Sequence, residues 1–152
     1  GGIMHLLGNM LYLNIYGDNL ENLMGHLRYA IYYLNCGILA SLAHVFTSAA
    51  LGANLLIPSQ GASGAISGVL GGYFLLFPKR RVRVLFLRSV IQVPALVAIG
   101  VWFLFQLISS VGMFSGGSGG GVAYGAHIGG FIAGMLVIKL LTLGRQPVPR
   151  PS

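Results

Sequence analysis

The feature that most constrains this chain is the absence of charge from two stretches of 50 residues each. No Asp, Glu, Lys or Arg occurs in residues 29–78 or in residues 89–138. A soluble domain carries charge on roughly a quarter of its residues, whereas only 7% of this chain is charged. So few charged groups cannot cover a water-facing surface, which argues against a soluble enzyme, a disordered tail or a nucleic-acid binder. The pattern predicts a polytopic membrane protein.

The length of the uncharged stretches predicts the number of spans. One bilayer span takes about 20 residues, so each stretch fits two spans joined by an uncharged turn. Turn-forming residues, including Pro58 in the first stretch and the glycine-rich run 115–121 in the second, interrupt them near the middle. We therefore expect an all-α membrane bundle. Its five predicted helices are about 3–24, 28–50, 62–78, 90–111 and 123–143.

The nine basic residues indicate an orientation. They occur at Arg28, in residues 79–88, and from Lys139 onward. Because membrane proteins collect Lys and Arg on the cytoplasmic side, these ends are expected inside and the uncharged turns outside. The net charge of +7 is therefore read as a topology signal and not as a nucleic-acid site. We expect one membrane domain over residues 1–143 and a cytoplasmic tail over residues 144–152.

Three polar side chains are expected at one depth in the bilayer. Ser63 lies 16 residues before Lys79, and His5 lies 16 residues before Glu21. At a rise of about 1.5 Å per residue, both distances correspond to about 24 Å. His127 has a similar separation from the basic residues that follow it. In a hydrocarbon core of about 30 Å, all three lie slightly below the outer surface, and polar groups there suggest function.

Stripes of small residues would bring two of these groups together. Small side chains allow transmembrane helices to approach closely. One stripe consists of His127, Gly130 and Gly134. A second stripe consists of Ser63 or Gly64, Ser67 or Gly68, and Gly71. If the stripes pack together, the Ser63 hydroxyl and the His127 imidazole become neighbours, which is the nucleophile–base pair of serine hydrolysis.

The position of the acidic residues restricts which groups could assist Ser63 and His127. A Ser-His-Asp triad needs a carboxylate beside the histidine. The two acids, Asp18 and Glu21, are expected near the cytoplasmic end, far from His127. We therefore expect a Ser-His dyad. The oxyanion of the tetrahedral intermediate would take hydrogen bonds from His5, Asn9 and the backbone N–H of Ser63.

At these residues the chain resembles the rhomboid family of intramembrane serine proteases. Four motifs occur in the family's order: HLLGN at His5–Asn9, the glycines and glutamate at Gly17, Glu21 and Gly25, GASG at Gly61–Gly64, and AHIGGFIAG at Ala126–Gly134. The ordered set is far more specific than G-x-S-G alone. The resemblance covers residues 1–143.

The resemblance implies a six-helix core that hydrolyses peptide bonds in or near transmembrane segments of single-span membrane proteins. It implies Ser63 as nucleophile, His127 as general base, His5 and Asn9 at the oxyanion, and neither metal nor cofactor. Five spans are expected here, with the family's first core helix missing from a chain truncated at its N-terminus. A bacterial-type enzyme of the plasma membrane, with its active site facing outward, is expected.

Several alternatives remain open. Some family members place a tyrosine one turn after the serine, against the histidine; here that position is Ser67, so another group must hold the ring. A non-catalytic rhomboid-like protein that binds transmembrane segments would not need the serine and histidine pair. A transporter or channel would need charged groups near the midplane, and none are apparent in the sequence.

Other residues have two interpretations each. Trp102, Phe103 and Phe105 either pack against lipid or form a lateral gate for substrate. The glycine-rich run 115–121 is either a connector or a mobile lid. His44 is expected to be a packing histidine.

Overall fold

The computed structural model describes residues 2–50, 62–114 and 124–143. The chain begins with three helical segments that run on without a break, α1 (Ile3–Tyr12), η1 (Leu13–Gly17) and α2 (Asp18–Met24). Together they match the first predicted helix. Gly25 then adopts a φ of +82°, a conformation that favours glycine, and the chain turns into α3 (His26–Ala50).

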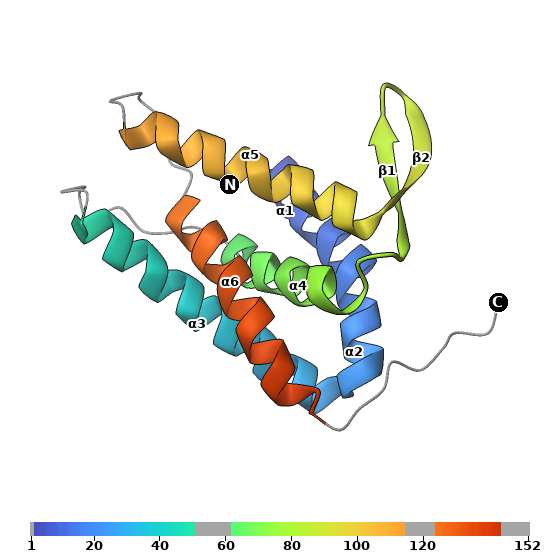
Figure 1. Cartoon of the computed structure of the whole chain (residues 1–152), viewed down its shortest axis with the longest axis horizontal. Helices are drawn as coiled ribbons and strands as arrows, with labels where there is room; N and C mark the ends of the chain where they lie inside the picture. The colour runs from blue at the N-terminus through green and yellow to red at the C-terminus, as the bar shows by residue number, and fades with distance from the viewer. Residues whose placement is uncertain (1, 51–61, 115–123, 144–152) are drawn as a thin grey trace.

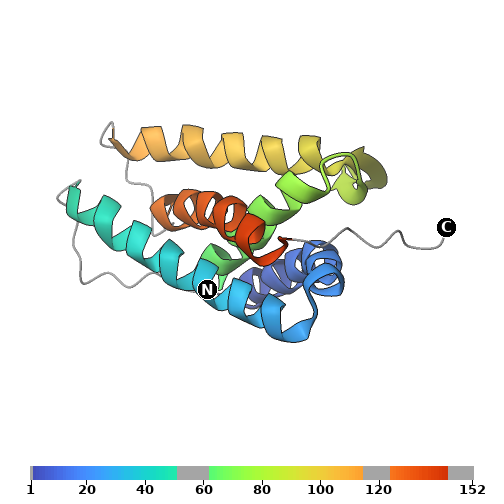
Figure 2. The same cartoon turned by 60° about the horizontal axis from the view of Figure 1, so that its bottom comes forward.

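Helix α4 (Ser63–Leu76) occupies the centre of the molecule. Figures 1 and 2 show it among α1, α3, α5 (Ala95–Phe114) and α6 (Tyr124–Leu141). Every residue from Gly64 to Tyr73 is buried. A helix that is apolar around its whole circumference is expected to be enclosed on all sides, and the composition of α4 fits that position.

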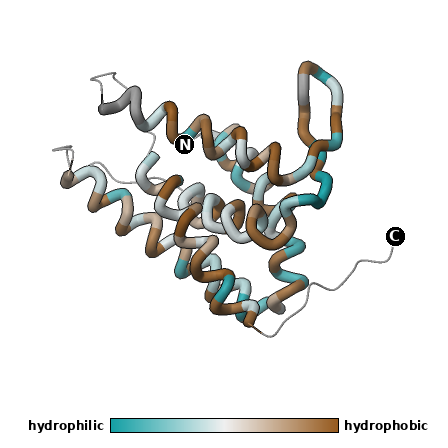
Figure 3. The backbone as a smooth tube through the Cα atoms, viewed as in Figure 1, coloured by the Kyte–Doolittle hydropathy of each residue, from teal (hydrophilic) through white to brown (hydrophobic). Residues whose placement is uncertain are grey.

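The outer helices carry apolar side chains on their exposed faces. Two helices, His26–Ala50 and Tyr124–Leu141, are long and apolar enough to cross a membrane, and two shorter apolar helices, Ser63–Leu76 and Ala95–Ser110, accompany them. Phe46 and Phe105 are 77% and 63% exposed. Figure 3 shows how much of the backbone tube is hydrophobic. Such surfaces suit contact with lipid chains better than contact with water.

Residues 81–94 form a β-hairpin, although the sequence predicted that a helix begins at residue 90. Strand β1 (Arg81–Phe86) pairs antiparallel with β2 (Ser89–Pro94), with Arg81 opposite Pro94 and Phe86 opposite Ser89. The prediction of a helix over 90–111 was therefore wrong at its beginning, because α5 begins at Ala95 and extends to Phe114. Figure 1 shows the hairpin projecting from the bundle beside the start of α5.

The local sequence explains the hairpin. Residues 81–84 alternate between arginine and valine, which is the period of a strand, and β-branched residues are common in residues 90–93. The two turn residues, Leu87 and Arg88, have φ values of +44° and +71°, as a two-residue hairpin turn requires. Pro94 then precedes a helix start. The end of α5 lies three residues beyond its prediction, and the ends of the other described helices lie within two residues of theirs.

Candidate active site

Helices α4 and α6 approach so closely that their backbones touch at glycine. An added Cβ on Gly130 would overlap the carbonyl oxygen of Gly64, and one on Gly134 would overlap the carbonyl of Gly68. Any larger side chain would force the helices apart. These four glycines define the α4–α6 seam. Of the alternatives left by the sequence, Gly64 and Gly68 supply the carbonyl groups that meet α6, while an added Cβ on either glycine would point toward α3. Gly61 lies outside the described residues.

Tyr32, on α3, connects a third helix to the seam through hydrogen bonds. Its side chain is fully buried. Its hydroxyl donates to the carbonyl oxygen of Gly68 at 2.6 Å and to that of Gly134 at 3.2 Å. One donor therefore connects α3 with both helices of the seam.

The seam places Ser63 and His127 in contact at its end. Ser63 is the first residue of α4, and His127 lies one turn into α6. The Ser63 hydroxyl oxygen lies 2.9 Å from the Nε2 atom of His127. This is hydrogen-bond distance for a nucleophile and its base, and it joins residues 64 positions apart in the chain.

A cavity of about 220 Å³ opens onto this pair. Helix α1 contributes His5 and Asn9 to its wall, which lie four residues apart and so share one helical face. Ser63, His127 and Trp102 line the same cavity. All four polar residues singled out in the sequence therefore border one space, with donors from α1 on one side and the serine–histidine pair on another.

Gln106 of α5 is a member of this group that the sequence reasoning missed. Its side chain is 7% exposed, and its Oε1 atom lies 3.0 Å from the Nδ1 atom of His127. Trp102, one turn earlier on α5, also meets the histidine, with 6.1 Å between ring centroids. An uncharged polar residue within an apolar span is a signal in its own right, and it could have been found.

Ser67 does not take the place of the tyrosine found in some family members. It is 1% exposed, and its hydroxyl donates to the carbonyl oxygen of Ser63 at 2.7 Å, within its own helix. The ring of His127 is instead contacted from α5.

The acidic residues lie away from the cavity, on α2. The carboxylate of Asp18 accepts a hydrogen bond from Asn22 at 3.0 Å. Glu21 lies 2.7 Å from Nδ1 of His26, whose side chain is 96% exposed. Among the residues that line the cavity around His127 there is no carboxylate. Within the described residues, no group of three His, Cys, Asp or Glu side chains is placed to hold a metal ion.

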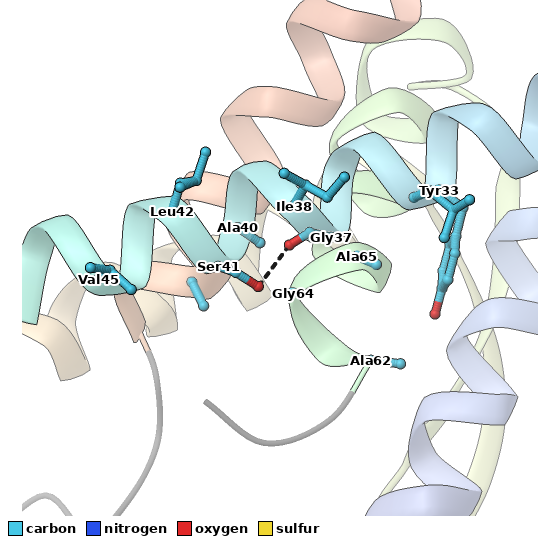
Figure 4. Close-up of a pocket in the computed structure, with 12 residues that line it drawn as sticks. Tyr33, Gly37, Ile38, Ala40, Ser41, Leu42, Val45, Ala62, Gly64 and Ala65 are labelled. Carbon is cyan, nitrogen blue, oxygen red and sulfur yellow. Dashed lines mark hydrogen bonds between the residues drawn. The ribbon is translucent and has the colours of Figure 1, made fainter. Parts of the chain in front are cut away.

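A larger cavity of about 520 Å³ lies on another side of α4, against α3. Figure 4 shows its lining, with Ile38, Leu42 and Val45 on α3 and Ala62 and Ala65 beside the start of α4. The Ser41 hydroxyl there donates to the carbonyl of Gly37 at 2.9 Å. The described lining offers no histidine or carboxylate to activate a nucleophile, so the smaller cavity is the better candidate for an active site.

The three aromatic residues of α5 lie in different surroundings. Trp102 lines the cavity, and Phe103 stacks on Phe131 of α6 with 4.3 Å between centroids. Phe105 is exposed on the surface of the bundle. His44 is half-buried on α3, away from the cavity. The run 115–121, considered above as a lid, lies outside the described residues.

Comparison with known proteins agrees with the motifs. A family model described as "Rhomboid domain" matches residues 1–143. The chain belongs to the rhomboid family. As a rhomboid domain it is a polytopic helical membrane bundle, and the all-α fold class predicted from the sequence is confirmed.

Named relatives are identical to this rhomboid domain at about a third of the aligned residues. Rhomboid protein 1, mitochondrial, of Saccharomyces cerevisiae is 35% identical over 135 residues, covering 87% of this chain and 36% of the relative. Rhomboid protease GluP of Bacillus subtilis is 36% identical over 145 residues, covering 93% and 24%. RHOMBOID-like protein 4 of Arabidopsis thaliana is 34% identical over 138 residues, covering 90% and 30%.

The chain spans between a quarter and two fifths of the length of these relatives. No solved structure matches this one. The relatives include mitochondrial and bacterial proteins, so membership of the family does not assign a particular membrane.

Proposed function

We propose that this rhomboid domain is an intramembrane serine endopeptidase that cleaves transmembrane or juxtamembrane segments of single-span membrane proteins. The observation that carries the proposal is the 2.9 Å contact between the Ser63 hydroxyl and Nε2 of His127. It lies at a cavity wall inside an apolar bundle, where an unneeded polar pair would be costly. The bilayer is both the solvent of the enzyme and the location of its substrates.

In the first step His127 acts as general base and Ser63 as nucleophile. Nε2 takes the hydroxyl proton as the oxygen attacks the scissile carbonyl carbon. His127 then gives that proton to the leaving amine, and an acyl-enzyme forms on Ser63. In the second half a water molecule attacks the ester and passes a proton to Nε2. The bond between the acyl carbon and the Ser63 oxygen then breaks, Nε2 returns the proton to that oxygen, and the peptide leaves with a new carboxyl end.

The tetrahedral intermediate needs donors aimed at its oxyanion. His5 and Asn9 line the cavity opposite the serine–histidine pair, and the backbone N–H of Ser63 lies at the start of α4, where helix N–H groups are unpaired. Donors fixed in a site with little water stabilise developing charge strongly. We assign these three groups to the oxyanion.

The orientation of the active site follows from the basic residues. Arg28, the hairpin and Lys139 lie at the ends expected to be cytoplasmic, so we place the cavity toward the outside. Residues 1–143 form the membrane domain and residues 144–152 a cytoplasmic tail in this proposal. We also propose the plasma membrane of a bacterium, on the similarity to a Bacillus subtilis protein, with a mitochondrial membrane as the alternative that the yeast relative offers.

The test is cleavage of a single-span substrate by the full-length protein in liposomes. Ser63→Ala and His127→Ala should each reduce product formation by at least about 10³-fold, the scale of loss for a nucleophile or base acting as a unit. A fluorophosphonate should label the wild type and fail to label Ser63→Ala. Ser41→Ala is the matched control, since the Ser41 hydroxyl donates to the backbone of its own helix, and it should cleave normally.

The outcomes separate the alternatives. Undiminished cleavage by Ser63→Ala would contradict the proposal. A wild-type protein that captures transmembrane segments, makes no product and resists labelling would instead be a non-catalytic rhomboid-like binder.

A further inference from the structure

Apart from the buried tyrosines, Gln106 is one of two buried polar side chains among the described residues, the other being Ser67. Ser67 donates to its own helix, which is a common way to accommodate a serine in an apolar helix. Gln106 instead reaches across to another helix and meets a ring nitrogen of His127 at 3.0 Å. A buried amide costs free energy unless it is hydrogen-bonded, so this contact explains its position.

The two nitrogens of His127 have different partners. Nε2 lies 2.9 Å from the Ser63 hydroxyl, and Nδ1 lies 3.0 Å from Oε1 of Gln106. A neutral imidazole has one N–H donor and one acceptor nitrogen. If Nδ1 carries the proton and donates to the amide oxygen, the lone pair of Nε2 must face Ser63. That tautomer is the one that can accept the serine proton.

We propose that Gln106 is the positioning residue of this active site, and that its amide oxygen takes the place that a carboxylate has in a Ser-His-Asp triad. The proposal rests on the proposed function, because it concerns the same proton transfer. Gln106 does not touch the reacting atoms. It acts through His127, by selecting the tautomer and fixing the direction of the ring.

The packing of α5 aims Gln106 at the histidine. Ile99 is 1% exposed, Trp102 lines the cavity, and Gln106 is buried. These positions are spaced i, i+3 and i+7, which places them on one helical face. Trp102 contacts the ring of His127 from the same side. The ring is therefore held by a hydrogen bond and by an aromatic contact, both from α5.

The choice of an amide fits the surroundings. A carboxylate buried among apolar helices would carry a large desolvation cost, while an amide accepts the same hydrogen bond without charge. The titratable side chains around the cavity are His5 and Tyr12 on α1 and His127 on α6. Helices α4 and α5 contribute no carboxylate or lysine to its described lining.

The experiment compares Gln106→Leu, Gln106→Glu and a control in the full-length protein in liposomes. Gln106→Leu removes the acceptor, and kcat should fall about tenfold with KM unchanged, as expected for one lost hydrogen bond. Phosphonate labelling of Ser63 should slow by the same factor. Gln92→Leu makes the same chemical change on the exposed strand β2 and should leave both rates unchanged.

The pH profile of Gln106→Glu distinguishes a positioning role from a merely structural one, which would leave the profile unchanged. This variant keeps the acceptor, so activity should be retained, while its carboxylate favours the imidazolium. The acidic limb of the pH profile of kcat/KM should therefore move to higher pH by about one unit or more. If Gln106→Leu does not fold, as judged by its melting transition, this profile decides the question.

An unchanged profile in Gln106→Glu, or normal kcat in a folded Gln106→Leu, would overturn the inference. Neither result would affect the proposed function, which fails only if the wild type neither cleaves nor becomes labelled. A wild type that is active, together with the two shifts described, supports both.

Discussion

The two sides of the cavity at Ser63 and His127 are built in opposite ways. The α4–α6 seam has carbonyl groups against glycine Cα atoms, and α4 is buried from Gly64 to Tyr73. Helix α1 on the other side has no buried residue, and His5 is exposed. One side has no space for an additional methyl group, and the other has space around nearly every side chain.

This difference matches what each side must do. In the proposed reaction, proton transfer between Ser63 and His127 depends on a short, fixed distance. Close contact between two helix backbones holds such a distance well, because tightly packed atoms are hard to compress. The proposed peptide substrate needs space beside Ser63, and the α1 side, which buries no residue, leaves that space. We therefore expect substitutions in the seam to affect folding and substitutions on α1 to affect turnover.

The largest effect is expected from Gly134→Ala. The new methyl group would meet the backbone of Gly68, which has no side chain that can move aside. The cost should reach or exceed the upper end of the usual range for overpacking, about 3 kcal/mol. Melting in detergent should drop sharply or no folded protein should be recovered.

Gly100→Ala is the control for that change. Its Cβ would lie 3.9 Å from the nearest atom, in Phe74, and alanine favours a helix over glycine by about 1 kcal/mol. Gly100→Ala should therefore be as stable as the wild type or more so. Equal melting temperatures for Gly134→Ala and Gly100→Ala would contradict the conclusion that the seam has no space for an added methyl group.

The second effect concerns catalysis and not folding. His5→Ala and Asn9→Ala should each lower kcat by about 10²-fold, the lower end of the range for an oxyanion donor. Because α1 buries no residue, the melting temperature should change little. Met10→Ala, an exposed neighbour on the same helix, should affect neither quantity. A loss of stability in His5→Ala matching its loss of activity would count against a role at the oxyanion.

The smallest effect is expected from Tyr32→Phe. It removes the hydroxyl that donates to Gly68 and Gly134 and keeps the ring. The free energy of unfolding should fall by about 1–2 kcal/mol, while kcat of the folded enzyme stays within about twofold of the wild type. Tyr33→Phe, on the half-buried neighbour, should change stability by less than about 0.5 kcal/mol. A large fall in kcat would show that the seam and the active site are not separable.

Most helices could be predicted from the sequence because a span in the bilayer requires apolar residues along its own length, whatever its neighbours are. The ends of the first helix and of α3, α4 and α6 lie close to their predicted positions. The hairpin at Arg81–Pro94 was missed because residues 79–88 were interpreted only as a topology signal and residues 90–94 were assigned to the apolar span that follows. The alternation of arginine and valine, together with Pro94, could have separated the two.

Gln106 was missed for a different reason. Its position in the sequence shows a polar residue within an apolar span, but nothing local indicates which helix it faces. The choice between Gly64 and Ser63, or Gly68 and Ser67, as the residue meeting α6 was open for the same reason. A rotation of about 100° separates neighbouring residues on a helix, and only packing fixes that rotation.

The sequence by itself determined the class of protein, the number and rough ends of most helices, the family and the polar residues worth attention. It could do so because charge scarcity, span length and motif order are properties of single segments. The tertiary structure decided which faces meet: Ser63 against His127, Gln106 behind the ring, and α1 across the cavity. Those contacts join residues from four helices, and their geometry depends on how closely glycine backbones can pack.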